Sequence, residues 1–311
     1  MKTNFETRRS GFSLVALIVL ILLAVAAVGM IFPYIAARRE AARRMQCVNN
    51  LKQLALAVLN YHAVNCDLPP EGLSAPDQTP ERQMGLFPRL LPFLEQSSLF
   101  DTLDWDDDCD SGANAAAGKR ALNVLLCPGG AQCQSVDPND SGAFTSHYYG
   151  NFGVVGENPS SHEAYPIFCS NRKNGDLADN GVFRIGKGYD LSAVVDGTSN
   201  TLMFFESSAD NYDGYRAWQR GAFQLAPPDE ENELNPWGDW IAHSSKTASL
   251  EFKVNAPLNA GGTFHAPINA AVVASGHSGG ANWAFVDGAV GFFSNDISDD
   301  VFLAFFSRNG G

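Results

Sequence analysis

The chain has few charged residues, and only a minority of these are basic. Charged residues make up 18% of the 311 positions, with 21 lysine and arginine residues against 34 acidic ones. A formal net charge of −13 at pH 7 repels nucleic acid phosphates, so we expect no nucleic-acid partner. Hydrophobic residues make up 45%, enough for a core in one large domain or two small ones. The local exception to the acidic character is the basic group Arg38, Arg39, Arg43 and Arg44.

The sequence also lacks two short motifs of redox and metal sites. It contains no C-x-x-C pair and no H-E-x-x-H. Ser278, His277 and Asp287 supply the residue types of a catalytic triad, but Asp287 is needed by a turn. A histidine hydrogen-bonded to turn backbone is therefore the favoured interpretation of His277. We expect no catalytic residue, no metal ligand and no cofactor.

Five aspartates are concentrated in one short segment, residues 104–110. An EF-hand calcium loop needs glycine at its sixth position and glutamate at its twelfth. Counted from Asp104, these positions hold Cys109 and Ala115. A solvated acidic loop is the favoured interpretation, and a calcium site is the alternative.

The first long hydrophobic run covers residues 12–32 and contains no charged residue. At about 1.5 Å per residue, a helix of this length crosses the roughly 30 Å core of a bilayer. Lys2, Arg8 and Arg9 precede it and favour an N-terminus on the cytoplasmic side. An Ala-Val-Ala site for a signal peptidase lies at 24–26, but the apolar run continues past it. We therefore expect a retained membrane anchor.

The helical pattern continues beyond Pro33. Strong helix formers dominate up to His62, and helix breakers follow at Asp67, Pro69 and Pro70. An apolar stripe at helical spacing is expected to pack on the domain that follows. We predict one helix over residues 12–62, with a transmembrane half (12–33) and an amphipathic half (34–63). The stripe consists of Val48, Leu51, Leu54, Ala55 and Val58.

These N-terminal features resemble those of a known group of proteins. The Gly11–Phe12 junction and Pro33 are similar to the start of type IV pilins and type II secretion pseudopilins. The segment AARREAARRMQCVNNLKQLALAVLNYH resembles more narrowly a bacterial prepilin-like family of unknown function, which carries an N-terminal cleavage/methylation motif and a C-terminal H-x9-D-G motif. The resemblance implies that residues 1–11 are a leader. It further implies cleavage after Gly11 by a prepilin peptidase and N-methylation of Phe12.

The C-terminal half carries further segments similar to this family. They are SHYYGNFG at 146–153, DGTSNTLMFFE at 196–206, and the H-x9-D-G signature. The polar turn before the buried strand of the second segment is explained by side-chain bonds to backbone rather than by catalysis. The family-motif residues are His277, Asp287, Gly288, Asp196, Gly197, Thr198 and Asn200.

Six cysteines allow 15 disulfide connectivities, among which the sequence cannot choose. Behind an export signal, disulfides are the better interpretation than metal binding or redox catalysis. Cys47 and Cys127 occupy positions similar to those of the family, and the resemblance suggests that they pair. The other four would then pair among themselves: Cys66, Cys109, Cys133 and Cys169.

The remainder of the chain, residues 64–311, is expected to form an α+β globular domain of the pilin-like type. Its long N-terminal helix should pack on a mainly antiparallel sheet. Asp287-Gly288 predicts a hairpin with a type I′ turn. Ser298 predicts the N-cap of a closing helix. Expected strand segments are 144–155, 181–186, 201–207, 249–254, 270–275, 281–286 and 289–294.

The resemblance implies a single-pass inner-membrane subunit of a pilus or type II secretion system, with its domain in the periplasm or outside the cell. Its expected partners are the inner membrane, other pilin-like subunits and the prepilin peptidase. Ala16, however, stands where such subunits carry glutamate, which predicts a minor or tip subunit. Two alternatives remain open. One is an anchored domain that binds glycan or protein without polymerising. The other is an anchored hydrolase, because the sequence does not give the separation of acidic pairs.

Overall fold

The computed structural model comprises two compact units, Met1–Arg43 and Arg44–Gly311. The described residues are 14–72, 84–140, 142–158, 161–170, 174–186, 188–208, 214–226, 239–250, 254–255 and 266–310. The predicted processing residues Gly11 and Phe12 lie outside these ranges.

Helix α1 covers Leu14–Asn65, which confirms the long N-terminal helix. It carries no charged residue before Arg38, and none of its most hydrophobic 18-residue stretch is buried inside the protein. Such a stretch is long and apolar enough to cross a membrane. The exposed side chains there include Leu14, Leu20, Leu23 and Val28.

The part of α1 in the second unit packs on the globular domain. Leu51, Leu54, Ala55 and Val58 are fully buried, which confirms four members of the predicted apolar stripe, whereas Val48 is half-buried. The helix ends where Cys66 takes a left-handed conformation, with φ at +62°. Its N–H still reaches the His62 carbonyl at 2.8 Å, a common way to close a helix.

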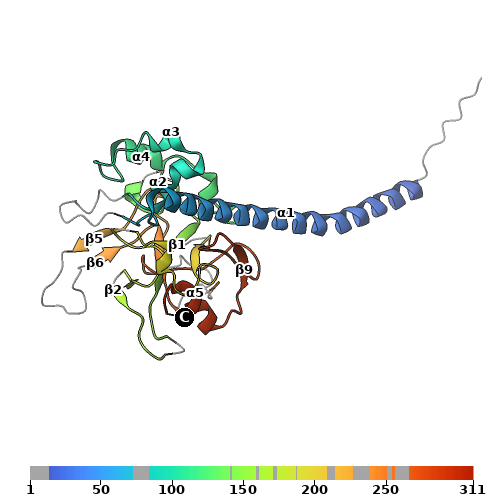
Figure 1. Cartoon of the computed structure of the whole chain (residues 1–311). Coiled ribbons are helices and arrows are strands. Elements are labelled where there is room, and N and C mark those ends of the chain that lie inside the picture. The colour runs from blue at the N-terminus through green and yellow to red at the C-terminus, as the bar shows by residue number, and fades with distance from the viewer. Residues whose placement is uncertain are drawn as a thin grey trace, which may run out of the picture. The chain divides into compact units, whose positions relative to one another are not determined.

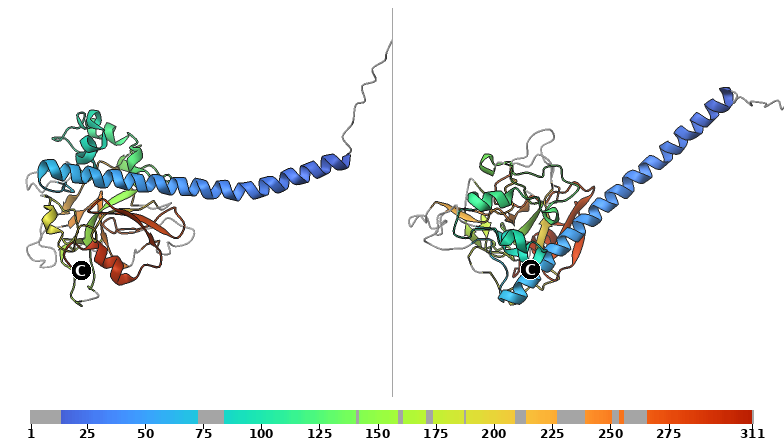
Figure 2. Two further views of the ribbon diagram at one scale, coloured as in Figure 1. Left: turned by 45° about the vertical axis from the view of Figure 1, so that its right-hand side comes forward. Right: turned by 90° about the horizontal axis from the view of Figure 1, so that it is seen from above.

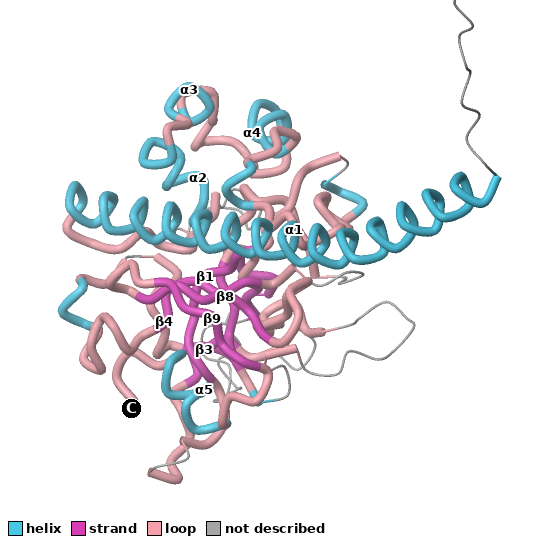
Figure 3. The backbone as a smooth tube through the Cα atoms, turned by 90° about the vertical axis from the view of Figure 1, so that its right-hand side faces the viewer, coloured by secondary structure: helices cyan, strands magenta, loops and turns pink. Residues whose placement is uncertain are grey.

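The domain is built on a five-stranded sheet of order β7-β1-β4-β8-β9. Figure 3 draws the strands in magenta. The pairs β1–β4, β4–β8 and β8–β9 are antiparallel, and β1–β7 is parallel. The predicted α+β class with a mainly antiparallel sheet is therefore confirmed. The strands are β1 (Tyr148–Val154), β4 (Leu202–Glu206), β7 (Ser245–Ala248), β8 (Gly280–Phe285) and β9 (Val290–Ser294).

Both faces of the sheet are covered, and each carries its own hydrophobic core. Phe204 points into the core shared with α1, and its neighbour Phe205 points into the opposite core. This alternation follows from the two-residue period of a strand. The opposite core is closed by helix α5 (Asp299–Phe306), which Figures 1 and 2 show on the far side of the sheet from α1. The predicted closing helix is confirmed, with Ser298 at its N-cap position.

Short elements complete the domain. Two small sheets pair β2 with β3 and β5 with β6. The remaining elements are α2 (Leu86–Leu90), α3 (Ser97–Phe100), α4 (Gly112–Gly118), β2 (Ile167–Cys169), β3 (Leu177–Ala178), β5 (Phe223–Ala226), β6 (Asp239–Ile241), and the 3-10 turns Leu91–Leu94, Asn123–Leu125, Pro138–Asp140 and Leu191–Ala193.

Two of the predicted strands are wrong. Residues 181–186 and 270–275 are buried segments with only isolated bridges, Gly72–Ile185 and Thr247–Ala270. Their apolar residues are buried in the hydrophobic cores without joining a regular sheet. A short apolar run fits either case, so periodicity alone does not separate them. The predicted strand 249–254 lies partly outside the described residues.

Glu71 and Lys246 are two buried ionisable side chains, the first next to β7 and the second on β7 itself. Glu71 Oε1 accepts the Ser244 N–H at 2.8 Å and the Ser245 N–H at 3.1 Å, and Oε2 accepts the Ser245 hydroxyl at 2.8 Å. Lys246 Nζ donates to the Ala242 carbonyl at 2.8 Å. Burial raises the pKa of Glu71 to about 7 and lowers the pKa of Lys246 to about 7.

These shifts predict a pH-dependent stability that Glu71→Gln removes. A raised carboxyl pKa contributes stability that is present below about pH 4.5 and is lost as pH rises through about 7. The lowered pKa of Lys246 acts above this window. We therefore expect the free energy of unfolding of the wild type, minus that of Glu71→Gln, to fall from pH 4.5 to pH 7 by on the order of 1 to 3 kcal/mol.

Denaturant unfolding of both full-length proteins in detergent, repeated across this pH range, measures the difference. His243 is also buried with a lowered pKa, but it is common to both proteins and cancels. Glu157→Gln is the control, because its carboxyl group is exposed and pairs with His162. A Glu71→Gln difference that stays constant with pH contradicts the assignment.

Candidate functional site

Four buried side chains from four distant parts of the chain converge at one point. Cys47 comes from α1, Cys127 from the turn after the 3-10 segment Asn123–Leu125, Glu206 from the end of β4, and His277 from the loop before β8. One donor atom from each lies within 4.8 Å of the others. We call these four residues the Cys-His-Glu cluster.

Asn50 positions Cys47 against the segment that leads to Cys127. It lies on the buried face of α1, about one turn beyond Cys47. Its side-chain Nδ2 donates to the Asn123 carbonyl at 3.2 Å and to the Leu126 carbonyl at 3.1 Å. These two bonds tie the helix to the turn.

Cys127 lies in a tight turn, Cys-Pro-Gly-Gly. The Gly130 N–H donates to the Cys127 carbonyl at 3.0 Å, and the Gly129 N–H donates to Cys127 Sγ at 3.3 Å. The Cys127 N–H in turn donates to His147 Nδ1 at 3.0 Å. A Cβ atom on Gly130 would lie 2.7 Å from His147 Cε1, so the close approach of the ring requires glycine there.

Glu206 has a fully buried carboxylate that is held by several donors. Oε1 accepts the hydroxyls of Ser208 and Ser275, each at 2.9 Å. Oε2 accepts Asn282 Nδ2 at 2.7 Å. These donors hold the carboxylate in place.

His277 faces the other three members through Nε2. This atom lies 3.3 Å from Cys47 Sγ and 3.5 Å from Cys127 Sγ. It also lies 3.5 Å from Glu206 Oε1. The backbone N–H of His277 donates to the Ser275 hydroxyl at 3.1 Å, so one serine orients both the histidine loop and the glutamate.

Cys47 and Cys127 form a disulfide, with Cα atoms 5.3 Å apart, which confirms the predicted pair. The expected pairing of the other four cysteines is wrong, because Cys66, Cys109 and Cys133 carry free thiols. These three lie at the end of α1, in the acidic loop, and in the segment after the Cys127 turn. Burial raises the pKa of the Cys109 thiol to about 12, so this residue behaves as a small apolar side chain.

The comparisons with known proteins give a family. A family model described as "Protein of unknown function (DUF1559)" matches residues 36–300, which include all four members of the cluster. The chain belongs to this family. No curated protein and no solved structure matches it.

In this DUF1559 protein the remaining motif residues form two adjoining turns. Asn200 Nδ2 donates to the Asp196 carbonyl at 3.0 Å, as expected for a turn held by side-chain bonds. The Asp287 N–H donates to the Thr198 carbonyl at 3.0 Å, so the two motifs meet. Gly197, within the first turn, has φ at +96°, a conformation that favours glycine.

The predicted type I′ turn at Asp287-Gly288 is wrong. That turn needs positive φ at both residues, but only Gly288 has it, at +86°. Asp287 Oδ1 accepts the Ala289 N–H at 2.8 Å, and the Gly288 N–H donates to the Phe285 carbonyl at 3.0 Å. The aspartate side chain thus holds a longer loop, in which glycine alone takes the left-handed position.

The acidic loop 104–110 is organised by its own side chains and by one arginine. Buried Asn114 accepts the Asp104 N–H at 3.0 Å and donates to the Asp104 carbonyl at 2.7 Å. Asp110 pairs with Arg220 at 3.1 Å. Within the described parts of the chain, the loop does not form a group of three or more converging His, Cys, Asp or Glu ligands, whereas the Cys-His-Glu cluster does.

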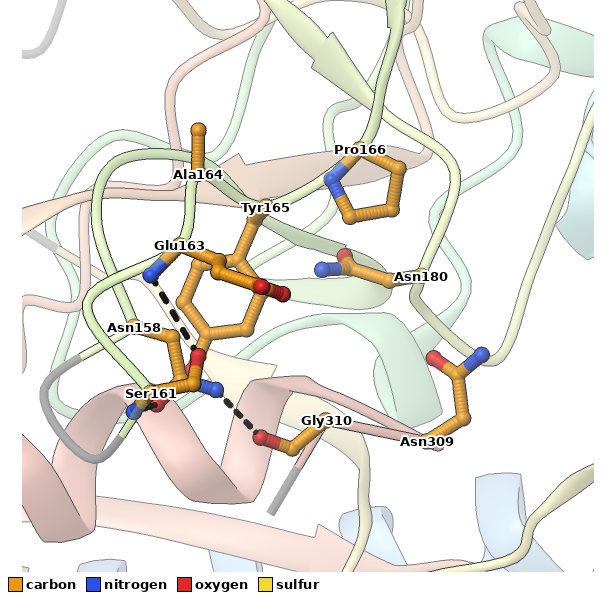
Figure 4. Close-up of a pocket in the computed structure, with 9 residues that line it drawn as sticks. All are labelled: Asn158, Ser161, Glu163, Ala164, Tyr165, Pro166, Asn180, Asn309 and Gly310. Atoms are coloured by element: carbon orange, nitrogen blue, oxygen red, sulfur yellow. Dashed lines mark hydrogen bonds between the residues drawn. The ribbon is translucent and has the colours of Figure 1, made fainter.

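A separate polar pocket adjoins the Asp196 turn (Figure 4). Gly310, which lines the pocket, donates its N–H to Asp196 Oδ2 at 3.0 Å. Asn158 Nδ2 donates to the Gly310 carbonyl at 2.6 Å across it, and the rings of Tyr165 and Pro166 form part of its wall. No member of the Cys-His-Glu cluster lines this pocket.

Sequence reasoning missed the Cys-His-Glu cluster as a unit. Cys47 and His277 are 230 positions apart, so no ligand-spacing motif links them. Glu206 was not singled out, although it is the last residue of the segment DGTSNTLMFFE. A usable signal was present: an acidic residue that ends a fully apolar strand needs buried partners.

Proposed function

We propose that this protein is a membrane-anchored, pilin-like structural or assembly subunit of a type II secretion or type IV pilus-like system. Helix α1 carries the proposal. One continuous helix, Leu14–Asn65, joins an uncharged segment of membrane-spanning length to a face whose leucines are buried in a globular α+β domain. A signal sequence that is cleaved off does not need a helix that continues into the folded domain.

Ala16 favours a minor or tip position over the interior of a fibre. A carboxylate within the bilayer is costly unless it is paired, so a glutamate at this position would direct contact with a neighbouring subunit. Alanine offers no such contact. We therefore expect this chain to be poor at forming homopolymeric fibres.

The proposed orientation has the domain in the periplasm or outside the cell. Lys2, Arg8 and Arg9 support a cytoplasmic N-terminus, and the Cys47–Cys127 disulfide suits an oxidising compartment. Cleavage after Gly11 and methylation of Phe12 belong to the same proposal.

A second candidate function is an anchored ligand-binding domain. A groove beside the end of α1 is lined by Tyr61, Phe93, Phe100 and Trp105, and the Arg89 guanidinium lies 5.0 Å from the Trp105 ring centroid. Aromatic faces beside a cation suit a sugar ring or a peptide side chain. Binding of a glycan by a protein that fails to capture pilin-like subunits favours this second function.

The deciding experiment follows the chain in its native envelope. We expect it to stay in the membrane after alkaline extraction and to begin at Phe12. After crosslinking, we expect it to capture other pilin-like subunits. Gly11→Val should block processing, whereas Ala26→Leu is the matched control that alters the signal-peptidase-like site and should leave the Phe12 end unchanged. An intact Met1, a new end at Ala27, or abundant fibres of this protein alone contradicts the proposal.

A further inference from the structure

We propose that Cys47, Cys127, Glu206 and His277 form a closed binding site for a zinc-class divalent cation. The cation is held when the two cysteines are reduced, and the Cys47–Cys127 disulfide excludes it. This inference goes beyond the proposed function, because it holds whether or not the protein enters a fibre.

The distances from His277 Nε2 to the other three donor atoms suit tetrahedral coordination. For ligand bonds of about 2.0 to 2.3 Å, tetrahedral geometry places neighbouring donor atoms about 3.3 to 3.8 Å apart. His277 Nε2 lies 3.3 Å from Cys47 Sγ, and 3.5 Å from both Cys127 Sγ and Glu206 Oε1. Glu206 Oε1 lies 3.1 Å from Cys127 Sγ, slightly below this range, and the two bonded sulfurs separate when the disulfide is reduced. The imidazole and carboxylate are therefore already arranged around a common centre beside the sulfurs.

The donor types point to zinc rather than to calcium or magnesium. Two thiolates, one imidazole and one carboxylate form a mixed sulfur, nitrogen and oxygen set, whereas calcium and magnesium prefer oxygen ligands. All four side chains are buried. Four protein ligands and no open position are typical of a structural metal site rather than a catalytic one.

The atoms around the ligands also match a metal site. The Gly129 N–H donates to Cys127 Sγ at 3.3 Å, and such a bond stabilises a thiolate. Ser208, Ser275 and Asn282 fix the Glu206 carboxylate through hydrogen bonds of 2.7 to 2.9 Å. Partners that orient the ligands in this way are a regular feature of protein metal sites.

A disulfide by itself does not account for this arrangement. It is neutral and needs neither a carboxylate nor an imidazole beside it. Burying a carboxylate is costly without a compensating charge, and a divalent cation supplies that charge at the place where Glu206 and His277 point. The disulfide fastens α1 to the Cys127 turn, and a cation would fasten it to Cys127, Glu206 and His277, so the helix stays attached in both states.

The exchange between the two states balances as a dithiol reaction. A reducing dithiol transfers two electrons and two protons to the Cys47–Cys127 disulfide, which gives two thiols and the oxidised reagent. The cation then binds both sulfurs, and their two protons pass to water.

The test uses the full-length protein in detergent, as disulfide and as dithiol, under anaerobic conditions. Each form is equilibrated with Zn²⁺, separated from free metal, and analysed for bound metal by mass spectrometry. We expect one zinc per reduced chain and at least tenfold less in the oxidised chain. Co²⁺ should give the intense visible bands of a tetrahedral site and a thiolate charge-transfer band. These readouts need no variant, so misfolding of a mutant cannot obscure them.

Variants then locate the site. His277→Ala and Glu206→Gln are expected to weaken zinc binding by at least tenfold, in line with the loss of a ligand. The matched controls are His162→Ala, an exposed histidine, and Cys66→Ser, an exposed free thiol, and both should bind one zinc. Bound zinc should also protect Cys47 and Cys127, but not Cys66, from alkylation.

Three results would overturn the proposal. One is a reduced wild-type chain that binds no zinc. Another is zinc binding that is unchanged in His277→Ala. The third is a cobalt complex without thiolate charge transfer. The proposed pilin-like function is judged separately by the Phe12 end and the captured subunits, so either can fail alone.

Discussion

Replacing both Cys47 and Cys127 with serine is expected to lower the free energy of unfolding by about 4 kcal/mol. The disulfide joins residues 80 positions apart, and the loss of so long a loop constraint frees the unfolded chain. The double replacement avoids leaving one reactive thiol in the core. Chemical unfolding of the full-length protein in detergent, monitored by near-ultraviolet circular dichroism, measures the change.

Two comparisons test the cause of that loss. Wild-type protein treated with a reductant and a chelator should lose a similar amount, because neither the disulfide nor a cation then holds the cluster. Cys66→Ser should change the free energy of unfolding by less than about 0.5 kcal/mol, since this thiol is exposed and free. A double-serine protein within about 1 kcal/mol of wild type would falsify the view that this link fastens α1.

The second large effect is expected for Trp283→Ala, with a loss of about 4 kcal/mol in the free energy of unfolding. Trp283 is fully buried on the face of the sheet away from α1. Its ring stacks on Phe293 with centroids 4.3 Å apart and meets Phe302 and Phe306 edge-on, each at 5.9 Å. Truncation leaves a large cavity between the sheet and α5.

The same unfolding measurement on two further variants separates cavity formation from the loss of any tryptophan. Trp105→Ala removes a half-buried indole in the acidic loop and should cost less than about 2 kcal/mol. Trp283→Phe keeps most of the volume. Trp283 Nε1 is buried without a hydrogen-bond partner within the described part of the chain, so this exchange also removes an unsatisfied donor. A loss as large for Trp283→Phe as for Trp283→Ala contradicts the cavity explanation.

Short sequence patterns correctly predicted the helices and strands whose formation depends on residues close together in the chain. Helix α1 follows from helix-forming residues and the spacing of Leu51, Leu54 and Val58, and it ends before Pro69 as expected. The hairpin strands β8 and β9 and the closing helix α5 follow from short patterns of the same kind. The turn at Gly288 was located correctly but assigned the wrong type. The Asp287 side chain accepts the Ala289 N–H and so stabilises a longer loop than a type I′ turn.

The prediction was wrong where an apolar run fits both a strand and an irregular buried segment. Residues 181–186 and 270–275 have strand-like composition, but they fill the cores as irregular segments. Their backbone groups find partners outside a regular ladder; for example, the Val182 and Phe183 N–H groups donate to the Asn151 carbonyl at 3.0 Å. Only the packed domain decides between these outcomes.

The sequence by itself determined a span-length apolar helix with an amphipathic continuation, an acidic domain, and the turns that bound its strands. Those properties depend on residues within a few positions of one another. The tertiary structure alone decided the Cys-His-Glu cluster, because its four members come from a helix, a turn, a strand end and a loop. Packing the sheet against α1 brings them together, and burial removes the water that would otherwise solvate Glu206, so the side chains must satisfy one another.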